Sequence, residues 1–357
     1  MNRSQAEAKF HSFLELVAQQ GASDLHLTVG RPPILRIDGR LYPIAGESKL
    51  SSEDTEEMAR AIMNEKQWER LQKERQMDLS VNLGEKARFR ANVYFQRGYL
   101  SAAFRLIPSK IKTLEELNLP PILYEFTKPS QGFVLITGPC GHGKSTTLAA
   151  LIDYINRTRQ DHIITIEDPI EYMFDPDMCI IDQREIFQDA NSFPTALKSV
   201  FREDADVVMV GEMRDLETIS TAITAAETGH LIFATLHTND AAQTIDRIVD
   251  VFPAHQQNQI RMQLASSLLG IVSQRLVNRL EGGRVPAIEI LFNNSAVGNL
   301  IREGKTHQIN LVIETSKDKG MTSLNRSLAD LVKQGIISLD EAETYSPNHE
   351  ELKILLR

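Results

Sequence analysis

One nine-residue segment constrains this chain more than any other. Gly138 to Thr146 reads GPCGHGKST and fits the pattern G-x-x-x-x-G-K-[ST], between the apolar run FVLIT and the helix-like run KSTTLAALIDYIN. Such a strand-to-helix loop turns backbone N–H groups and the positive end of a helix toward an anion. The segment therefore predicts a triphosphate site whose cradle is formed by Gly138, Pro139, Cys140, Gly141, His142, Gly143, Lys144, Ser145 and Thr146, with Lys144 on the β- and γ-phosphates and Ser145 on Mg²⁺.

The sequence around this loop predicts an α/β domain over residues 132–357. The apolar runs GFVLITG, HIITIED, DVVMVGE and HLIFATLHT are bounded by turns and alternate with helical stretches. Short buried runs alternating with helices are typical of a parallel sheet that is covered on both faces. From about residue 294 the sequence becomes mostly helical, which predicts a helical C-terminal region.

Residues 1–108 have a different hydrophobic pattern from residues 132–357. Phe10, Phe13, Leu14 and Val17 follow the spacing of one helical stripe, and a polar helical stretch runs from about Ser52 to Gln76. The remaining runs, among them DLHLTV, MDLSVNL, RFRANVYFQ and YLSAAFRLI, alternate as antiparallel strands do. We expect an N-terminal α+β domain, followed by a proline-rich linker over residues 109–131.

Composition limits the function classes that remain. The 357 residues hold 39 basic and 48 acidic side chains, a net charge of −9 that argues against a nucleic-acid partner. The two cysteines, Cys140 and Cys179, exclude a disulfide scaffold and a tetracysteine zinc site. No apolar run reaches the ~18 residues that span a membrane, so we expect a cytoplasmic protein without direct membrane insertion.

Carboxylates follow two of the predicted strands. Glu167 and Glu171 come at the carboxyl end of HIITIE, and Glu212 comes at the end of DVVMVG, the edge where open α/β sheets bind ligands. Gly211 stands where a metal-binding Asp would usually follow the apolar run, so Glu212 is expected to take the metal-side role. A solvated acidic rim is the alternative, and the residues alone do not rank Glu171 above Glu167.

Two histidines and a group of cations complete the candidate site. His230 and His237 lie at opposite ends of the run LIFATL, so they are not expected to share a metal. His237, at the carboxyl end, is either a buried core residue or a sensor of the γ-phosphate. Residues 86–110 hold six cations and no acid. They form either a solvated strand face or a source of arginines, among them Arg90 and Arg105, for a phosphate in the transition state.

Five ordered motifs together resemble a known family. They are the N-terminal pair SDLHLTVGRPPILRIDG and RFRANVYFQ…AAFR, the Walker A segment, IEDPIEY as an Asp box, VGEMRDLETI as an atypical Walker B segment and TGHLIFATLHT as a His box. The chain is similar in these motifs to the secretion-superfamily hexameric ATPases, the GspE/PilT family, and within it to the motors of type IV pilus retraction.

The resemblance implies a fold and a chemistry. It implies a PAS-like N-terminal domain, a RecA-like P-loop ATPase domain and a homohexamer that uses ATP and Mg²⁺. It makes Glu171 the general base and Glu212 the carboxylate that holds the metal through water. It places His230 and His237 in the His box, Glu167 among the nucleotide-binding residues, and Arg90 and Arg105 on the phosphates.

The resemblance also implies partners. A retraction motor works at the cytoplasmic side of the pilus base, on a PilC-like inner-membrane platform protein and beside a paralogous motor of the PilT, PilU or PilB type. Two departures from the family pattern leave alternatives open. Cys140 and His142 stand where the Walker A loop usually has Thr and Ser, and Gly298 of AVGNLIRE stands where the retraction motif AIRNLIRE has Arg. The alternatives are a nucleotide-gated accessory ATPase of the PilU kind and an extension or type II secretion motor.

Overall fold

The computed structural model describes residues 3–37, 39–84, 87–107 and 110–357. The chain divides into two compact units: Met1–Lys110 with Asp168–Met173, and Ile111–Glu167 with Phe174–Arg357. The predicted end of the first domain, residue 108, lies outside the described residues, so the limits 1–108, 109–131 and 132–357 stay a prediction.

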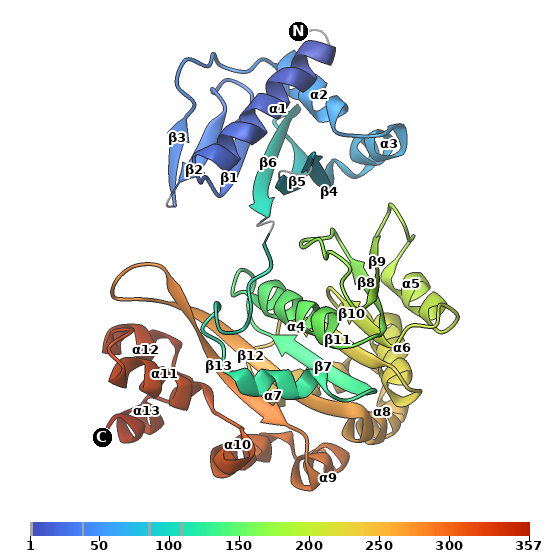
Figure 1. The fold of residues 1–357 in the computed structure, drawn as a ribbon, viewed down its shortest axis with the longest axis vertical. Helices are drawn as coiled ribbons and strands as arrows, with labels where there is room; N and C mark the ends of the chain where they lie inside the picture. The colour runs from blue at the N-terminus through green and yellow to red at the C-terminus, as the bar shows by residue number, and fades with distance from the viewer. Residues whose placement is uncertain (1–2, 38, 85–86, 108–109) are drawn as a thin grey trace. The chain divides into compact units, whose positions relative to one another are not determined.

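The described residues of the first unit form an antiparallel sheet and three helices (Figure 1). Its strand order is β3-β2-β1-β6-β5-β4. Asn64 divides the predicted helical stretch 52–76 in two, because its side chain and that of Gln67 cap each other's backbone N–H groups at 2.9 Å. The elements are α1 (Arg3–Gln19), β1 (Asp24–Thr28), β2 (Ile34–Ile37), β3 (Arg40–Pro43), α2 (Ser52–Ala61), α3 (Glu65–Glu74), β4 (Gln76–Leu83), β5 (Ala87–Gln96) and β6 (Tyr99–Ile107).

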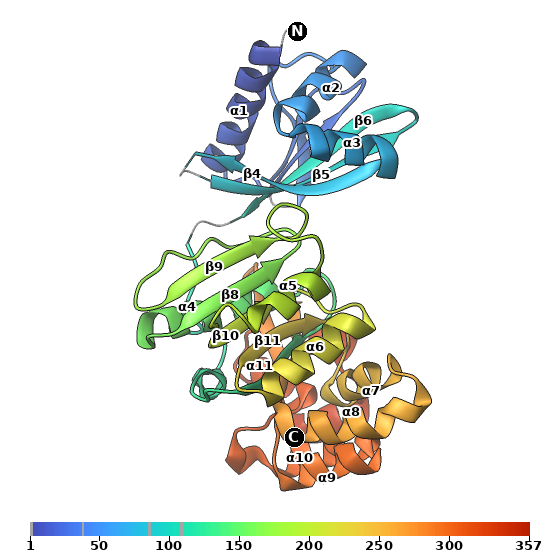
Figure 2. The same cartoon turned by 90° about the vertical axis from the view of Figure 1, so that its right-hand side faces the viewer.

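The helices of this unit cover one face of its sheet (Figure 2). Phe10 and Leu14 of α1 share a core with Phe89 and Phe104 of the strands, and all four are fully buried. Alternate residues of β5 are only partly buried, as period-2 geometry requires. The sheet therefore keeps one polar face, and that face carries the arginines of the predicted site.

The second unit contains a seven-stranded sheet in the order β13-β12-β7-β11-β10-β8-β9. Its strands pair in parallel, except that β13 runs antiparallel to β12. The predicted parallel sheet is thus confirmed in β7, β8, β10 and β11, whereas β9, β12 and β13 were not predicted. The bounds are β7 (Gly132–Thr137), β8 (His162–Glu167), β9 (Ile180–Glu185), β10 (Val207–Val210), β11 (Leu231–Leu236), β12 (Leu268–Asn278) and β13 (Arg284–Phe292).

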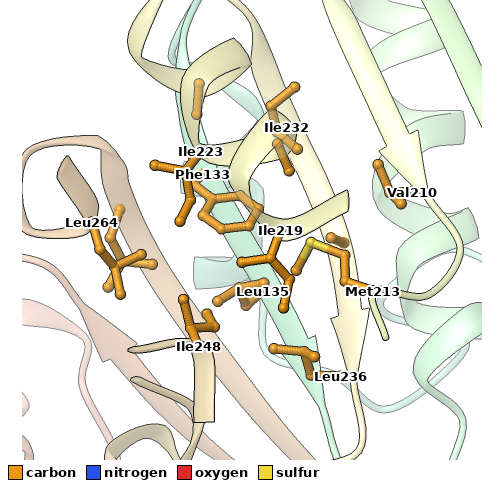
Figure 3. Packing of buried hydrophobic residues seen from close by; sticks show 14 of the residues in the cluster. Phe133, Leu135, Val210, Met213, Ile219, Ile223, Ile232, Leu236, Ile248 and Leu264 are labelled. Carbon is orange, nitrogen blue, oxygen red and sulfur yellow. The ribbon is translucent and has the colours of Figure 1, made fainter. Parts of the chain in front are cut away.

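Helices cover both faces of this sheet. Figure 3 shows Phe133 and Leu135 of β7 packed with Ile219 and Ile223 of α6 and Leu264 of α8 on one face. On the other face α4 packs against β7 and β11. The helices are α4 (Lys144–Thr158), α5 (Phe193–Val200), α6 (Leu216–Glu227), α7 (Ala241–Asp250) and α8 (Ala254–Ser267), with the 3₁₀ turn η1 (Pro121–Thr127) before the sheet.

The C-terminal region is helical, as predicted. Gly304 ends α9 in the left-handed conformation that favours glycine. Among the residues that the structure describes, none of the helices combines the length and the apolar character that a membrane span requires. The elements are α9 (Ser295–Glu303), α10 (Ile309–Thr315), α11 (Leu324–Lys333), α12 (Leu339–Tyr345) and α13 (His349–Leu356), with the 3₁₀ turns η2 (Thr306–Gln308) and η3 (Lys317–Lys319).

Candidate nucleotide site

The segment Gly138–Thr146 joins the end of β7 to the start of α4, and we call it the phosphate loop. Gly138, Gly141 and Gly143 have φ values of 141°, 78° and 84°, which side chains rarely allow. The helix begins at Lys144, and the hydroxyl-bearing Ser145 lies exposed in its first turn. Backbone N–H groups at a helix start and an exposed hydroxyl fit a Mg²⁺-bound triphosphate.

Lys144 joins the loop to the His237 end of β11. The Lys144 side chain is buried, and its Nζ donates to the carbonyls of Gly138 at 2.8 Å and Pro139 at 2.9 Å. Nζ also lies 3.3 Å from Nδ1 of His237. An ammonium has no acceptor, so Nδ1 accepts and the ring proton sits on Nε2.

That proton faces Glu212. The Nε2 atom of His237 lies 3.0 Å from Oε1 of Glu212, which follows the end of β10. Burial acts to raise the pKa of Glu212, but the Arg214 guanidinium, 2.7 Å away, and His237 outweigh it and hold the pKa below its usual value. Glu212 is therefore a carboxylate at neutral pH, which is the form that a divalent cation requires.

The structure gives different surroundings to Glu167 and Glu171, which the sequence alone does not rank. Glu167 is the last residue of β8 and is buried, where it accepts hydrogen bonds from Thr165 Oγ1 at 2.7 Å and Gln183 Nε2 at 3.4 Å. Glu171 belongs to the segment 168–173, which groups with the first unit, and its Oε1 lies 3.1 Å from Nη1 of Arg90. Glu167 is held by polar groups, whereas Glu171 forms an ion pair.

The arginines lie together on the polar face of the first unit's sheet, as the alternation predicted. Arg90 of β5 stands directly opposite Arg105 of β6 in the strand register. Asp24 lies 2.9 Å from Arg105, and Asp78 lies 3.9 Å from Arg90. Like charges in direct cross-strand contact are destabilising, and these carboxylates offset that repulsion. Lys86, one of the six cations, lies outside the described residues.

His230 is at the opposite end of β11 from His237, as predicted. Its Nδ1 lies 3.1 Å from the carbonyl oxygen of Ala225, and its ring meets Phe201 edge to face. These contacts are those of a packed residue. Among the residues that the structure describes, no group of three or more His, Cys, Asp or Glu side chains could hold a metal ion by itself.

His142 in the loop, and Gln274 and Arg275 near it, have roles that sequence reasoning missed. His142 Nδ1 accepts the backbone N–H of Leu276 at 2.9 Å, and burial, followed by Arg275, Arg284 and Lys144, lowers the pKa of His142. The Gln274 side chain donates to the carbonyl of His142 in the phosphate loop, and the Arg275 guanidinium donates to Oδ1 of Asn239. The signal available was the polar pair Gln274-Arg275 inside the apolar run LLGIVSQRLV, since buried polar side chains need specific partners.

Comparisons with known proteins agree with these motifs. The family model described as "Type II/IV secretion system protein" matches residues 3–283. The type IV pilus retraction ATPase PilT of Pseudomonas aeruginosa is 46% identical over 329 residues, which cover 92% of this chain and 95% of that protein. The type IV pilus ATPase PilU of the same organism is 38% identical over 350 residues, 98% of this chain and 91% of that protein.

A solved structure agrees as well. The crystal structure of the pilus retraction motor PilT with bound ADP superimposes with a TM-score of 0.89 at 47% identity, and the match covers 96% of this chain and 98% of that one. The resemblance to retraction ATPases that the motifs predicted is confirmed. The chain belongs to the type II/IV secretion system protein family and is an ATPase of that family.

Proposed function

We propose that this chain is an ATP-hydrolysing motor that powers type IV pilus retraction and twitching motility. The observation that carries the proposal is the contact series Lys144–His237–Glu212, which joins the phosphate loop to the ends of β10 and β11. It occurs in a chain whose similarity to PilT extends over nearly its whole length. Its domains are then a PAS-like N-terminal domain and a RecA-like ATPase domain with a helical C-terminal region.

The residues divide the chemistry among them. The N–H groups of the phosphate loop and Lys144 bind the β- and γ-phosphates, and His230 and Glu167 belong to the nucleotide-binding set. Ser145 and Glu212 are the residues that would hold Mg²⁺, Ser145 directly and Glu212 through water. Mg²⁺ supplies charge neutralisation and orientation of the phosphates. Glu171 takes the proton of the attacking water, and His237, which contacts both Lys144 and Glu212, senses the γ-phosphate.

Arg90 and Arg105 neutralise charge on the phosphates in the transition state. Their placement on one polar face supports this role, since two opposed cations have no stabilising effect on a sheet by themselves. The proposal gives the protein a homohexameric ring, in which arginines act within a subunit or on a neighbouring one. Hydrolysis then moves the domains against each other.

The proposed partner is a PilC-like inner-membrane platform protein, on which the ring acts from the cytoplasmic side at the pilus base. A paralogous motor of the PilT, PilU or PilB type is a further partner. The net charge of −9 favours neither nucleic acid nor anionic lipid. Type II secretion motors usually carry a tetracysteine zinc insert, and two cysteines cannot form one.

A second candidate is a nucleotide-gated accessory ATPase of the PilU kind. Gly298 favours it, because this position in α9 is Arg in the retraction motif. The two candidates differ in whether the chain retracts pili by itself.

A deletion strain of the host tests both candidates, with pilus retraction measured on single cells. We expect the deletion to abolish or slow retraction, and the wild-type chain but not Lys144→Ala to restore it. If Lys144→Ala restores retraction as well as the wild type, the chain acts as a scaffold and the motor proposal is wrong. Gly298→Arg serves as a third arm that tests the retraction motif.

A further inference from the structure

Three successive residues of β12, Gln274 to Leu276, bond the two loops of the candidate site. We propose that two of them, Gln274 and Arg275, are positioning residues of the ATPase: Gln274 holds the phosphate loop, and Arg275 holds the loop that carries His237. The inference rests on the ATP hydrolysis assigned above, and it adds residues that none of the recognised motifs contains.

The Gln274 side chain bonds both the phosphate loop and helix α4. Its side chain is 2% exposed, its Nε2 donates to the carbonyl of His142 at 2.9 Å, and its Oε1 accepts from Thr147 Oγ1 at 2.7 Å. One amide thus joins the tip of the loop to the first turn of α4. Because a buried amide loses free energy when it is left without partners, these bonds fix the spacing between loop and helix.

The loop glycines show how closely β12 approaches. A Cβ at Gly138 would lie 2.4 Å from the carbonyl oxygen of Gln274, and a Cβ at Gly143 would lie 2.8 Å from its Nε2. At two of the three loop glycines, therefore, the approach of β12 leaves no room for a side chain, in addition to the space that a phosphate needs. The backbone N–H of Leu276 donates to Nδ1 of His142, which is a further bond between β12 and the phosphate loop.

Arg275 points to the other face of the sheet, as the next residue in a strand must. It is 8% exposed, and its Nη2 donates to the carbonyl of Asn239 at 3.1 Å and to its Oδ1 at 2.8 Å. Glu289, on the neighbouring strand β13, accepts the N–H of Ala241 at 2.8 Å. Two strands therefore hold the segment Asn239–Ala241, which begins two residues after His237.

The two positions predict different kinetic effects. A loose phosphate loop binds nucleotide less well, so loss of the Gln274 amide raises KM and the dissociation constant of nucleotide. A loose segment 239–241 lets His237 drift from Glu212 and Lys144, which lie 3.0 and 3.3 Å away. Loss of the Arg275 guanidinium therefore lowers kcat while the phosphate loop still binds nucleotide.

The experiment compares near-isosteric variants of the full chain. Phosphate release gives kcat and KM, and a fluorescent N-methylanthraniloyl ATP analogue gives the dissociation constant. We expect Gln274→Leu, which removes both side-chain hydrogen bonds, to raise KM and the dissociation constant about tenfold, with kcat changed less than about threefold. We expect Arg275→Met to lower kcat about tenfold with the dissociation constant changed less than about threefold, and Arg275→Lys to recover part of the rate.

Arg279→Met is the matched control, since Arg279 lies just past the end of β12 and bonds Gly282 and Gly283 through its backbone. Kinetics of both variants equal to those of the control would overturn the proposal. Equal loss of kcat and affinity in both variants would also overturn it, because it would indicate general support of the fold. If thermal melting shows that either variant unfolds, kcat and the dissociation constant are measured for Gln274→Glu and Arg275→Lys instead. The proposal then stands if the Gln274 variant loses affinity and the Arg275 variant loses rate. A wild-type chain without hydrolysis would contradict the proposed function, and analogue binding would still test Gln274.

Discussion

At the scale of single residues, the charge arrangement on β5 and β6 is the feature that stability does not explain. Arg90 and Arg105 face each other across the strands, and each is matched by carboxylates: Asp24 for Arg105, and Asp78 with Glu171 for Arg90. Asp24 is buried, but the arginine side chains of these pairs are 41% and 68% exposed. Ion pairs of solvent-exposed arginines contribute ~0–1 kcal/mol, so they offset the repulsion without adding much to the stability of the fold. Because the two opposed arginines repel each other and add little to stability, we expect them to act on an anion.

The Arg90→Ala variant tests that role. We expect turnover to fall about a hundredfold or more while affinity for ATP changes less than about threefold, because an arginine that acts on transition-state charge contributes little to ground-state binding. Steady-state phosphate release and analogue binding measure the two quantities. Arg97→Ala is the control, since it removes a cation from the β5–β6 turn at a residue with φ of 51° that strains Arg and Ala alike. Equal losses of rate and affinity in Arg90→Ala would argue for a binding role only.

At the scale of elements, local patterns in the second unit predicted β7, β8, β10 and β11 and missed β9, β12 and β13. β7, β10 and β11 are buried at every position, and their runs of Val, Ile, Leu and Phe are evident in the sequence. β9 reads IIDQRE and has only one fully buried residue. β12 follows α8 without a break and carries Ser-Gln-Arg in its centre.

The partners of those polar residues could not be predicted, because they are distant in sequence. Thr147 and Gln274, for example, are 127 residues apart. The same limit applies to the site. The motifs identified Lys144, Glu212 and His237, but only the folded chain shows that one imidazole contacts both of the others.

Glu289 of β13 gives a pH-dependent prediction at this scale. Burial raises the pKa of its carboxyl from 4.5 to about 7; Asp240 and Glu351 act in the same direction, while the Ala241 N–H and Arg275 act against it. Between these two pH values the folded chain keeps a proton that the unfolded chain releases, so stability falls as pH rises through this window. Relative to Glu289→Gln, the wild type should lose about 3 kcal/mol of unfolding free energy from pH 4.5 to pH 8. Urea unfolding at several pH values measures the difference, and a difference that does not change with pH would refute the assignment.

Two glycines give opposite predictions for one substitution. A Cβ at Gly270 in β12 would lie 2.3 Å from the carbonyl oxygen of Leu291 and 2.5 Å from the Phe126 ring, so Gly270→Ala should destabilise the fold by about 2 kcal/mol or more. At Gly298 in α9 the nearest atom would be 3.5 Å away, so Gly298→Ala should stabilise by about 0.5–1 kcal/mol through helix propensity. Melting temperatures that shift in the same direction for both variants would contradict the packing described for β12.

At the scale of the whole molecule, an acidic chain concentrates its phosphate chemistry in two places. The phosphate loop belongs to the second unit, and the opposed arginines belong to the first. In the proposed mechanism both sets of side chains act on the phosphates of ATP, and hydrolysis drives the movement of the motor. This coupling requires that the chain turn over ATP, and that Mg²⁺ be needed for it.

Steady-state phosphate release by the purified full chain tests this claim most directly. With ATP and Mg²⁺ we expect release by the wild type, and release near background for Lys144→Ala and Glu171→Gln. Removal of Mg²⁺ by EDTA should abolish release, and added Mg²⁺ should restore it. Arg97→Ala should match the wild type. Release by the wild type no greater than that by Lys144→Ala would contradict the motor and leave a nucleotide-gated scaffold in its place.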